Sequence, residues 1–177
     1  ADAAARCRFD PLSWVRFAFD WGYGELAGYA GPRAWQAAAF GEIAAHLQNP
    51  ETRFMPLMLA RASGHGIGKS AFIGMLVNWA LSTCDDCKVV LTSNTDTQLR
   101  TKTAPEVGKW MRLGITREWF DVSATCIASR DKANARTWRA DFVPWSEHNT
   151  EAFAGLHNKG KRILLVFDEA SAIADKV

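Results

Sequence analysis

The sequence has few cysteines, little net charge and no long uninterrupted hydrophobic run. Its cysteines lack the regular spacing of a disulfide framework, which favours a reducing compartment. They are Cys7, Cys84, Cys87 and Cys126. The longest apolar stretch, residues 72–81, is interrupted by Gly74 and Asn78, so we expect no membrane-spanning helix and no membrane partner. The first ten residues lack the apolar run of a signal peptide, and these absences together indicate a cytoplasmic protein.

The charges of the chain nearly cancel. Lysine and arginine number 21 against 19 acidic residues, which leaves a formal charge of +2. Proteins that bind phosphate backbones usually carry a strong basic excess, so contact with DNA has to come from local patches. Two groups of residues qualify: Arg130, Lys132, Arg136 and Arg139 with Trp138, and Lys159, Lys161 and Arg162. The alternative for each group is an ordinary solvated face.

The chain is long enough for one sizeable core, since 48% of its 177 residues are hydrophobic. We divide it into residues 1–53, an aromatic and glycine-rich lead-in that packs on the core, and residues 54–177, which form the core. Within the lead-in, residues 7–30 are expected to be irregular. Residues 35–47 have the spacing of a helix that ends at Asn49 and Pro50.

The first half of the core has the pattern of a strand, a helix and a second strand. Residues 54–60 form a short apolar run and are expected to be a buried strand. Residues 71–81 then have helical character, and residues 88–93 have the composition of another buried strand.

The second half of the core has three further expected elements. Residues 98–111 are expected to be helical, with Pro105 beginning, breaking or kinking the helix. Alternation of apolar and polar residues over 121–145 predicts a β-hairpin. Residues 163–167, ILLVF, form the most hydrophobic expected strand, which we place centrally in the sheet.

The segment SGHGIGKS lies between the first expected strand and its helix. It comprises Ser63, Gly64, His65, Gly66, Ile67, Gly68, Lys69 and Ser70. A glycine-rich loop in this position aims backbone N–H groups at a polyphosphate, and the helix N-terminus adds a favourable partial charge. In such a P-loop Lys69 reaches the β- and γ-phosphates of ATP, and the Ser70 hydroxyl ligates Mg²⁺. Ser63 stands where the usual pattern has glycine, and a glycine-rich turn without a ligand is the alternative.

Two adjacent carboxylates, Asp168 and Glu169, directly follow ILLVF. In open α/β sheets, ligands bind at the carboxyl ends of the strands, where these side chains are expected. We assign Asp168 to the Mg²⁺ shell and Glu169 to the orientation or deprotonation of the attacking water, with Lys69 as its catalytic partner on the phosphates. The alternative is a solvated pair that caps a helix beginning near Ala170.

The two motifs in this order predict the fold class. It is an α/β P-loop NTPase (RecA/ASCE-like), a three-layer sandwich with a mostly parallel central sheet and a β-hairpin before the strand at 163–167. The predicted activity is Mg²⁺-dependent hydrolysis of ATP.

The chain resembles the ATPase portion of the large terminase subunit of tailed bacteriophages. Five segments carry the resemblance: GPRAWQ at 31–36, SGHGIGKS at 63–70, VVLTSNTDTQLR at 89–100, EAFAGLH at 151–157 and LLVFDEAS at 164–171. The resemblance implies a motor that drives double-stranded DNA into a procapsid in the bacterial host cytoplasm. The implied partners are a portal protein, a small terminase subunit and further copies of the chain in a ring. It also implies that a coupling motif and a nuclease domain lie beyond Val177, so we expect no nuclease activity from this chain.

The resemblance further suggests an adenine-recognition element at Gln36, with Trp35 and Arg33 beside it. An amide suits the donor and acceptor edge of adenine. A glutamine on a helix face beside a core tryptophan is the alternative.

Two positions depart from the family pattern. Many relatives have an arginine where this chain has His65 or Ala154, and that arginine stabilises charge during phosphoryl transfer. The charge has to come from elsewhere in the chain or from a neighbouring subunit. The candidates are Arg100, Arg130, Arg136, Arg139 and Arg162.

The alternative functions are a helicase or another P-loop motor, and a non-catalytic module that binds ATP and partners. Two weaker signals favour neither. Cys84 and Cys87 lack further ligands at the spacing of a zinc site and do not begin a helix as a redox pair would. His157 could sense the γ-phosphate, although a loop histidine is more often an ordinary hydrogen-bonding residue.

Overall fold

A computed structural model of the chain describes residues 2–62, 66–145, 157–158 and 160–169, which have an α/β fold. The helices are α1 (Asp2–Arg6), α2 (Pro11–Ala18), α3 (Ala34–Gln48), α4 (Lys69–Ser82), α5 (Asp96–Gln98) and α6 (Ala104–Leu113). Shorter turns are the 3₁₀ segments η1 (Gly24–Leu26) and η3 (Arg117–Trp119) and the π-helical segment η2 (Leu99–Thr103). The strands are β1 (Lys88–Ser93), β2 (Phe120–Val122), β3 (Cys126–Ser129), β4 (Arg139–Phe142) and β5 (Ile163–Asp168).

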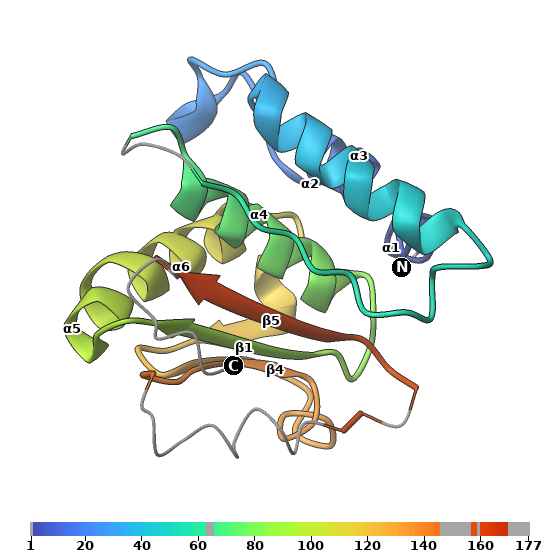
Figure 1. The fold of residues 1–177 in the computed structure, drawn as a ribbon. Coiled ribbons are helices and arrows are strands. Elements are labelled where there is room, and N and C mark those ends of the chain that lie inside the picture. Colours follow the sequence, from blue (N-terminus) through green and yellow to red (C-terminus); the bar gives the residue numbers. More distant parts are fainter. Residues whose placement is uncertain (1, 63–65, 146–156, 159, 170–177) are drawn as a thin grey trace.

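The strands form one five-stranded mixed sheet in the order β2-β3-β4-β1-β5 (Figure 1). β1 pairs in parallel with both β4 and β5, which aligns Ser93 with Asp168 at the carboxyl ends. β3 pairs antiparallel with β4, as the predicted hairpin requires, and with β2 on its other side. The α/β class and the hairpin are therefore confirmed, while the P-loop arrangement stays a prediction.

Helices α4 and α6 pack against one face of the sheet, and α2 and α3 lie beyond α4 (Figure 1). α4 is buried continuously from Phe72 to Ser82, as expected for a helix covered on all sides. β1 is buried along nearly its whole length. The predicted helix at 71–81 and strand at 88–93 are thus confirmed at the centre of the fold. Among the described helices, none is long and apolar enough to cross a membrane.

The lead-in is more regular than its composition suggests, because residues 11–18 form α2. Asp10 caps this helix by accepting a hydrogen bond from the backbone N–H of Ser13 at 2.9 Å, and Pro11 suits its first turn. Trp14 is 1% exposed, and its indole N–H donates to the Asn78 side chain on α4 at 2.9 Å. The lead-in therefore contains a helix that the sequence analysis missed, and this helix contacts α4 through Trp14.

The region predicted as a helix over 98–111 is helical but interrupted. Pro105 lies in the first turn of α6. Proline has no N–H, and in a continuous α-helix its ring would clash with the carbonyl of Thr101. The π-helical η2 avoids this conflict, since the N–H of Ala104 bonds to the carbonyl of Leu99 five residues earlier.

The prediction of a buried strand over residues 54–60 is wrong. No strand is present there, and the side chains of Phe54 and Met58 are 86% and 92% exposed. Pro56 cannot donate a hydrogen bond to a neighbouring strand, which disfavours pairing in the interior of a sheet. The segment is apolar, but it does not join the sheet.

This segment is held by α3 instead. The carbonyl oxygen of Met55 lies 3.0 Å from Nε2 of His46, and Arg61 forms an ion pair with Glu42. Only Leu59 among its larger side chains packs against the core. The chain therefore passes along α3 on its way to the predicted phosphate loop.

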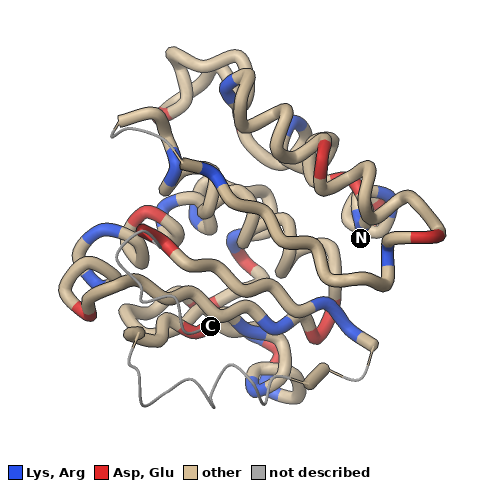
Figure 2. Tube along the Cα trace, in the orientation of Figure 1, with Lys and Arg blue, Asp and Glu red and all other residues tan. Residues whose placement is uncertain are grey.

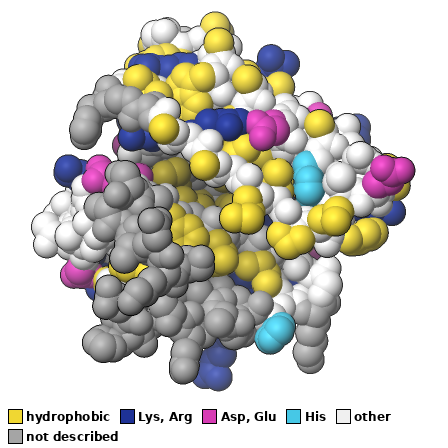
Figure 3. Space-filling view, viewed as in Figure 1, with side chains coloured by type: hydrophobic (Ala, Val, Ile, Leu, Met, Phe, Trp, Pro, Cys, Tyr) yellow, Lys and Arg dark blue, Asp and Glu magenta, His cyan; other side chains and the backbone are white. Residues whose placement is uncertain are grey.

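β5 is consequently an edge strand of the described sheet rather than the central strand predicted. Its residues Ile163 and Leu165 are 37% and 40% exposed, although Val166 on the opposite face is buried. Figure 3 shows hydrophobic side chains gathered on the face that carries β5.

The contact between α4 and α6 gives a test of the packing. A Cβ added at Gly74 would lie 2.5 Å from Cδ1 and 2.8 Å from Cβ of Trp110. These atoms lie near the α6 backbone and cannot swing aside, so Gly74→Ala is expected to destabilise the fold by about 1–3 kcal/mol. Gly41→Ala in α3 meets nothing within 4 Å and should instead gain up to about 1 kcal/mol of helix propensity. Urea unfolding followed by tryptophan fluorescence measures both, and equal midpoints would contradict this packing.

Candidate functional site

Helix α4 runs back along the sheet, from the carboxyl ends of the strands to their amino ends. The side chain of Arg162, which immediately precedes β5, donates to the carbonyl of Ala80 at 3.3 Å and to Thr83 Oγ1 at 2.9 Å. The end of α4 therefore lies where β5 begins. Since a helix of 14 residues is about 21 Å long, its first residues, Lys69 and Ser70, reach the edge where β1 and β5 end (Figure 1).

The last part of the predicted phosphate loop enters α4 in a conformation that glycine allows. Gly66 has φ 77° and Gly68 has φ 90°, both in the left-handed region. The residue before α4 is Gly68, which has no side chain that could cap the helix. Lys69 and Ser70 are half-buried. The remaining predicted loop residues, Ser63, Gly64 and His65, lie outside the described residues.

The two carboxylates lie at the carboxyl end of β5, and each contacts a residue that the sequence analysis did not assign. Asp168 Oδ2 accepts a hydrogen bond of 2.6 Å from the hydroxyl of Thr103, which is fully buried. Glu169 accepts a hydrogen bond from the side-chain amide of Gln98. The backbone of Glu169 has φ 57°, a conformation that costs a non-glycine residue about 1–2 kcal/mol. Such strain accumulates at functional sites, and here it falls on the residue predicted to orient water.

The beginning of α3 is hydrogen-bonded to the same loop through three side chains. The indole N–H of Trp35 donates to the carbonyl of Ile67 at 3.0 Å. The side-chain amide of Gln36 donates to the carbonyl of Gly68 at 2.8 Å. Arg33 Nη1 lies 3.4 Å from the carbonyl oxygen of Gly66. We call Trp35 and Gln36 the clasp. These contacts join the predicted adenine-side residues to the predicted phosphate loop.

Both the oxygen and the nitrogen of the Gln36 amide already form hydrogen bonds within the protein. Its side chain is 3% exposed, and its oxygen accepts a hydrogen bond from the backbone N–H of Arg33 at 2.8 Å. An adenine bound by Gln36 would have to replace the bond to Arg33 or the bond to Gly68. Adenine recognition by Gln36 thus stays a prediction. Binding a base in this way would break one of the two internal hydrogen bonds of the Gln36 amide.

Of the five arginines considered for charge stabilisation, Arg100 alone lies at this edge, next to Gln98 and paired with Asp96 at 2.8 Å. The other four lie at the opposite edge of the sheet, where the parallel strands begin: Arg130, Arg136, Arg139 and Arg162. The six steps from Arg162 to Asp168 span roughly 20 Å of extended chain. These four side chains therefore cannot reach a ligand at Asp168 of the same chain, and a contribution in trans stays a prediction.

Arg162 is built into the fold. Its guanidinium stacks over Trp79 at 3.9 Å from the ring centroid, and it donates to the backbone carbonyl of Arg8. Burial lowers the pKa of this guanidinium. Arg162 thereby connects the turn after α1 with α4 and β5, which leaves it unsuited to contact DNA.

Three other residues of the two basic groups pair with carboxylates, namely Arg130, Arg139 and Lys161. Arg139 Nε is 2.9 Å from Asp141 Oδ1, and Lys161 Nζ is 2.6 Å from Asp85 Oδ2. The hydrogen bond from Lys161 lowers the pKa of the Asp85 carboxyl. Figure 2 shows acidic residues close to the basic ones in the part of the chain where the parallel strands begin. Trp138 is half-buried and donates to the carbonyl of Leu81.

Lys132 and Arg136 are exposed and form no ion pair with a carboxylate among the described residues, and Lys159 lies outside the described residues. A DNA contact at this edge stays a prediction that now depends chiefly on those two residues.

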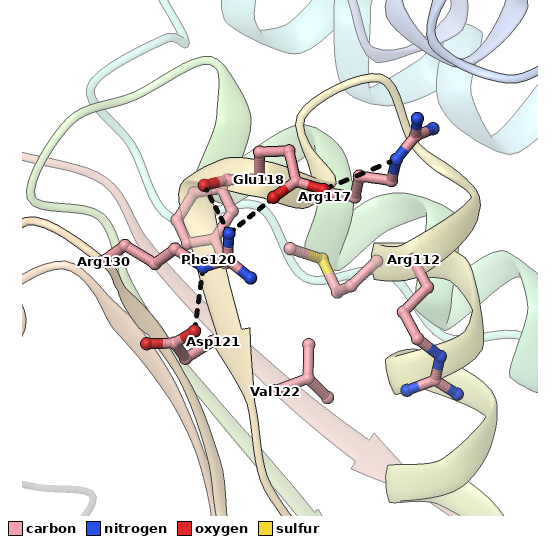
Figure 4. Close-up of a pocket in the computed structure, with 8 residues that line it drawn as sticks. Arg112, Arg117, Glu118, Phe120, Asp121, Val122 and Arg130 are labelled. Atoms are coloured by element: carbon pink, nitrogen blue, oxygen red, sulfur yellow. Dashed lines mark hydrogen bonds and ion pairs between the residues drawn. The ribbon is translucent and has the colours of Figure 1, made fainter.

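A pocket of about 460 Å³ lies beside β2, which is the outer strand of the sheet opposite β5. Figure 4 shows Arg130 between the carboxylates of Glu118 and Asp121, at 2.6 and 2.8 Å. The other residues that line this pocket are Met111, Arg112, Arg117, Phe120 and Val122. Four strand spacings separate β2 from β5, about 19 Å. The pocket therefore does not belong to the edge that carries Asp168.

The weaker sequence signals have structural explanations. Cys84 and Cys87 are buried, and burial raises the pKa of the Cys87 thiol to about 12. A thiol with this pKa stays protonated near neutral pH and is a poor nucleophile or metal ligand. The carbonyl of His157 accepts a hydrogen bond from Lys88, the first residue of β1. His157 is thus near the edge opposite Asp168, which speaks against sensing of a γ-phosphate there.

Comparisons with protein-family models, with curated proteins and with solved structures found no match to this chain.

Proposed function

We propose that the chain binds Mg²⁺-ATP at the edge formed by the start of α4 and the end of β5, and that it hydrolyses this nucleotide. One observation carries the proposal. A loop with two left-handed glycines leads into the start of α4, at the edge where β5 ends in Asp168 and is followed by Glu169. Donors for a polyphosphate and carboxylates for a cation and a water are thereby brought to one edge from distant parts of the sequence.

Each side chain has a chemical role in this proposal. The Lys69 ammonium contacts the β- and γ-phosphates, while the N–H groups at the start of α4 donate to phosphate oxygens. Glu169 orients the attacking water and accepts its proton. The strained backbone and the bond from Gln98 limit the orientations of this carboxylate.

The Ser70 hydroxyl and the Asp168 carboxylate fit a Mg²⁺ ion, which prefers oxygen ligands. The described part of the chain has no group of three or more His, Cys, Asp or Glu that could hold a metal ion by itself. The remaining oxygens would come from the nucleotide and from water. When bound, Mg²⁺ supplies neutralisation of phosphate charge.

The cellular role that we propose is the ATPase part of a large terminase subunit in a bacterial host. The motor would drive double-stranded DNA into a procapsid, as a ring of copies on a portal protein, with a small terminase subunit selecting the DNA. The support is the resemblance carried by the segments at 31–36, 63–70, 89–100, 151–157 and 164–171. A helicase sharing this core is the alternative motor.

A non-catalytic ATP-binding module is the alternative from another class. It is favoured by the position of the arginines, since four of the five candidates lie roughly 20 Å or more from Asp168. Among the described residues, the cations on this side of the sheet include Lys69, Arg100 and Arg33, and an arginine from a neighbouring subunit would add to them.

Phosphate release from ATP separates these functions. The assay uses this chain, and a longer polypeptide that continues past Val177, each with and without Mg²⁺ and linear double-stranded DNA. We expect Mg²⁺-dependent release that DNA stimulates in the longer polypeptide. Binding of ATP without phosphate release from either protein selects the non-catalytic module, and separation of DNA strands selects the helicase.

A further inference from the structure

Three consecutive carbonyls of the predicted phosphate loop accept hydrogen bonds from the start of α3. They belong to Gly66, Ile67 and Gly68, and the two shorter bonds come from the clasp. In each of these two bonds, donor and acceptor are 32 positions apart in the sequence. Side chains on one helix thus fix the direction of the carbonyls just before another helix begins.

The direction of a carbonyl determines the direction of the next N–H. In a trans peptide, the C=O of one residue and the N–H of the following residue point to opposite sides, and no described peptide bond is cis. The carbonyls of Ile67 and Gly68 point toward α3, so the N–H groups of Gly68 and Lys69 point away from it. These are the donors that a polyphosphate uses in a loop of this kind.

The clasp itself is held rigidly. The Trp35 ring packs on Phe72 of α4 at 5.4 Å between centroids, and Phe72 packs on Phe40 of α3 at 4.6 Å. The Gln36 amide is fixed at both ends, by the backbone N–H of Arg33 and by the carbonyl of Gly68. Neither side chain can turn toward a nucleotide base without losing a contact within the protein.

The fit between the clasp and the loop is close. A Cβ added at Gly68 would lie 3.1 Å from Nε2 of Gln36. The left-handed φ of Gly68 independently disfavours any other residue. The loop is therefore shaped around the amide of Gln36 at this point.

We propose that Trp35 and Gln36 are positioning residues of the phosphate loop. They hold its carbonyls toward α3, so that its N–H groups are presented to the triphosphate before the ligand arrives. This inference rests on the proposed ATP site and gives Gln36 a positioning role instead of adenine recognition. Because the clasp acts on the triphosphate through the loop, it strengthens nucleotide binding equally for every base.

The test compares three probes that share a triphosphate, namely ATP, GTP and inorganic tripolyphosphate, each with Mg²⁺. Trp35→Phe keeps an aromatic ring, although a smaller one, and removes the N–H donor, and Gln36→Leu removes both amide bonds. Losing a hydrogen bond that holds a partly buried loop carbonyl should weaken binding about tenfold. We expect a loss of this size for all three probes, measured by isothermal titration calorimetry.

Trp21→Phe is the matched control. The Trp21 indole also donates to a backbone carbonyl, that of Val15 at 2.9 Å, but in the lead-in away from the loop. We expect Trp35→Phe and Trp21→Phe to lower the thermal midpoint of the unliganded chain similarly, while only Trp35→Phe lowers the affinities. Should Gln36→Leu fail to fold, Trp35→Phe still provides the comparison.

Two results would overturn the inference. One is a loss of affinity for ATP alone in Gln36→Leu, with GTP and tripolyphosphate unchanged, because that is the result of base recognition. The other is unchanged affinity for all probes in the folded variants. A wild-type chain that binds none of the three probes instead contradicts the proposed ATP site.

Discussion

Lys69→Ala is expected to abolish measurable ATP turnover and to weaken ATP binding. Lys69 is the first residue of α4 and lies at the carboxyl-terminal edge of the sheet, where β5 ends in Asp168. Its ammonium would neutralise charge that develops on the phosphates, and loss of one preorganised charge-stabilising group costs about 10²–10³-fold in rate. The bound state also loses a charge-assisted hydrogen bond, which weakens binding by about ten- to a hundredfold.

The matched control for this substitution is Lys132→Ala. It removes the same charge from an exposed lysine in the turn between β3 and β4, at the opposite edge of the sheet. Steady-state phosphate release and calorimetric titration of ATP should leave Lys132→Ala within about twofold of the wild type. Equal losses in the two variants would mean that a general charge effect, and not the loop, governs nucleotide binding.

Glu169→Gln is expected to separate binding from hydrolysis. Glutamine has the same shape and still meets Gln98, but it cannot accept a proton from water. Loss of a general base lowers turnover by about 10²–10⁴-fold, whereas ATP affinity should change by less than about threefold because the phosphate contacts persist. Single-turnover hydrolysis and equilibrium titration of the same preparation measure the two quantities.

Glu51→Gln serves as the control, since Glu51 is an exposed carboxylate in the turn after α3. Undiminished turnover in Glu169→Gln would show that this carboxylate is not the base. Loss of binding along with turnover would indicate that Glu169 holds the loop or the cation instead.

The elements defined by local pattern could be predicted from the sequence. The strand at residues 88–93 has the predicted bounds, and α3 and α4 extend the predicted helices by one or two residues at each end. These segments combine a clear period or a buried apolar run with stop signals such as Asn49. The helix α2 was missed because its signal is short, an Asp10 cap followed by Pro11 in a helix of only eight residues.

The segment at 54–60 shows what an apolar run alone does not determine. Hydrophobic composition is compatible with a strand, yet pairing also needs a neighbouring strand and backbone donors. Pro56 lacks a donor, and the hydrogen bond between Met55 and His46 holds the chain on α3. Which element an apolar segment joins is decided by contacts distant in the sequence.

The candidate site shows the same division. The residues of the loop and the carboxylate pair could be proposed from motifs, because local backbone chemistry requires glycine, lysine and acidic residues at fixed positions. The contacts of Thr103 with Asp168 and of Trp35 with Ile67 could not, since they depend on tertiary structure. The candidate arginines could be sorted only from the strand register, which fixes the edge of the sheet on which each one lies.

The most direct test of the central claim is calorimetric titration of the wild-type chain with Mg²⁺-ATP, repeated in the presence of saturating inorganic tripolyphosphate. We expect one ATP bound per chain, with a dissociation constant of about 1 μM to 1 mM, and competition by tripolyphosphate because the loop holds the phosphates. Absence of binding at millimolar ATP, or binding that tripolyphosphate does not displace, would contradict the proposed ATP site.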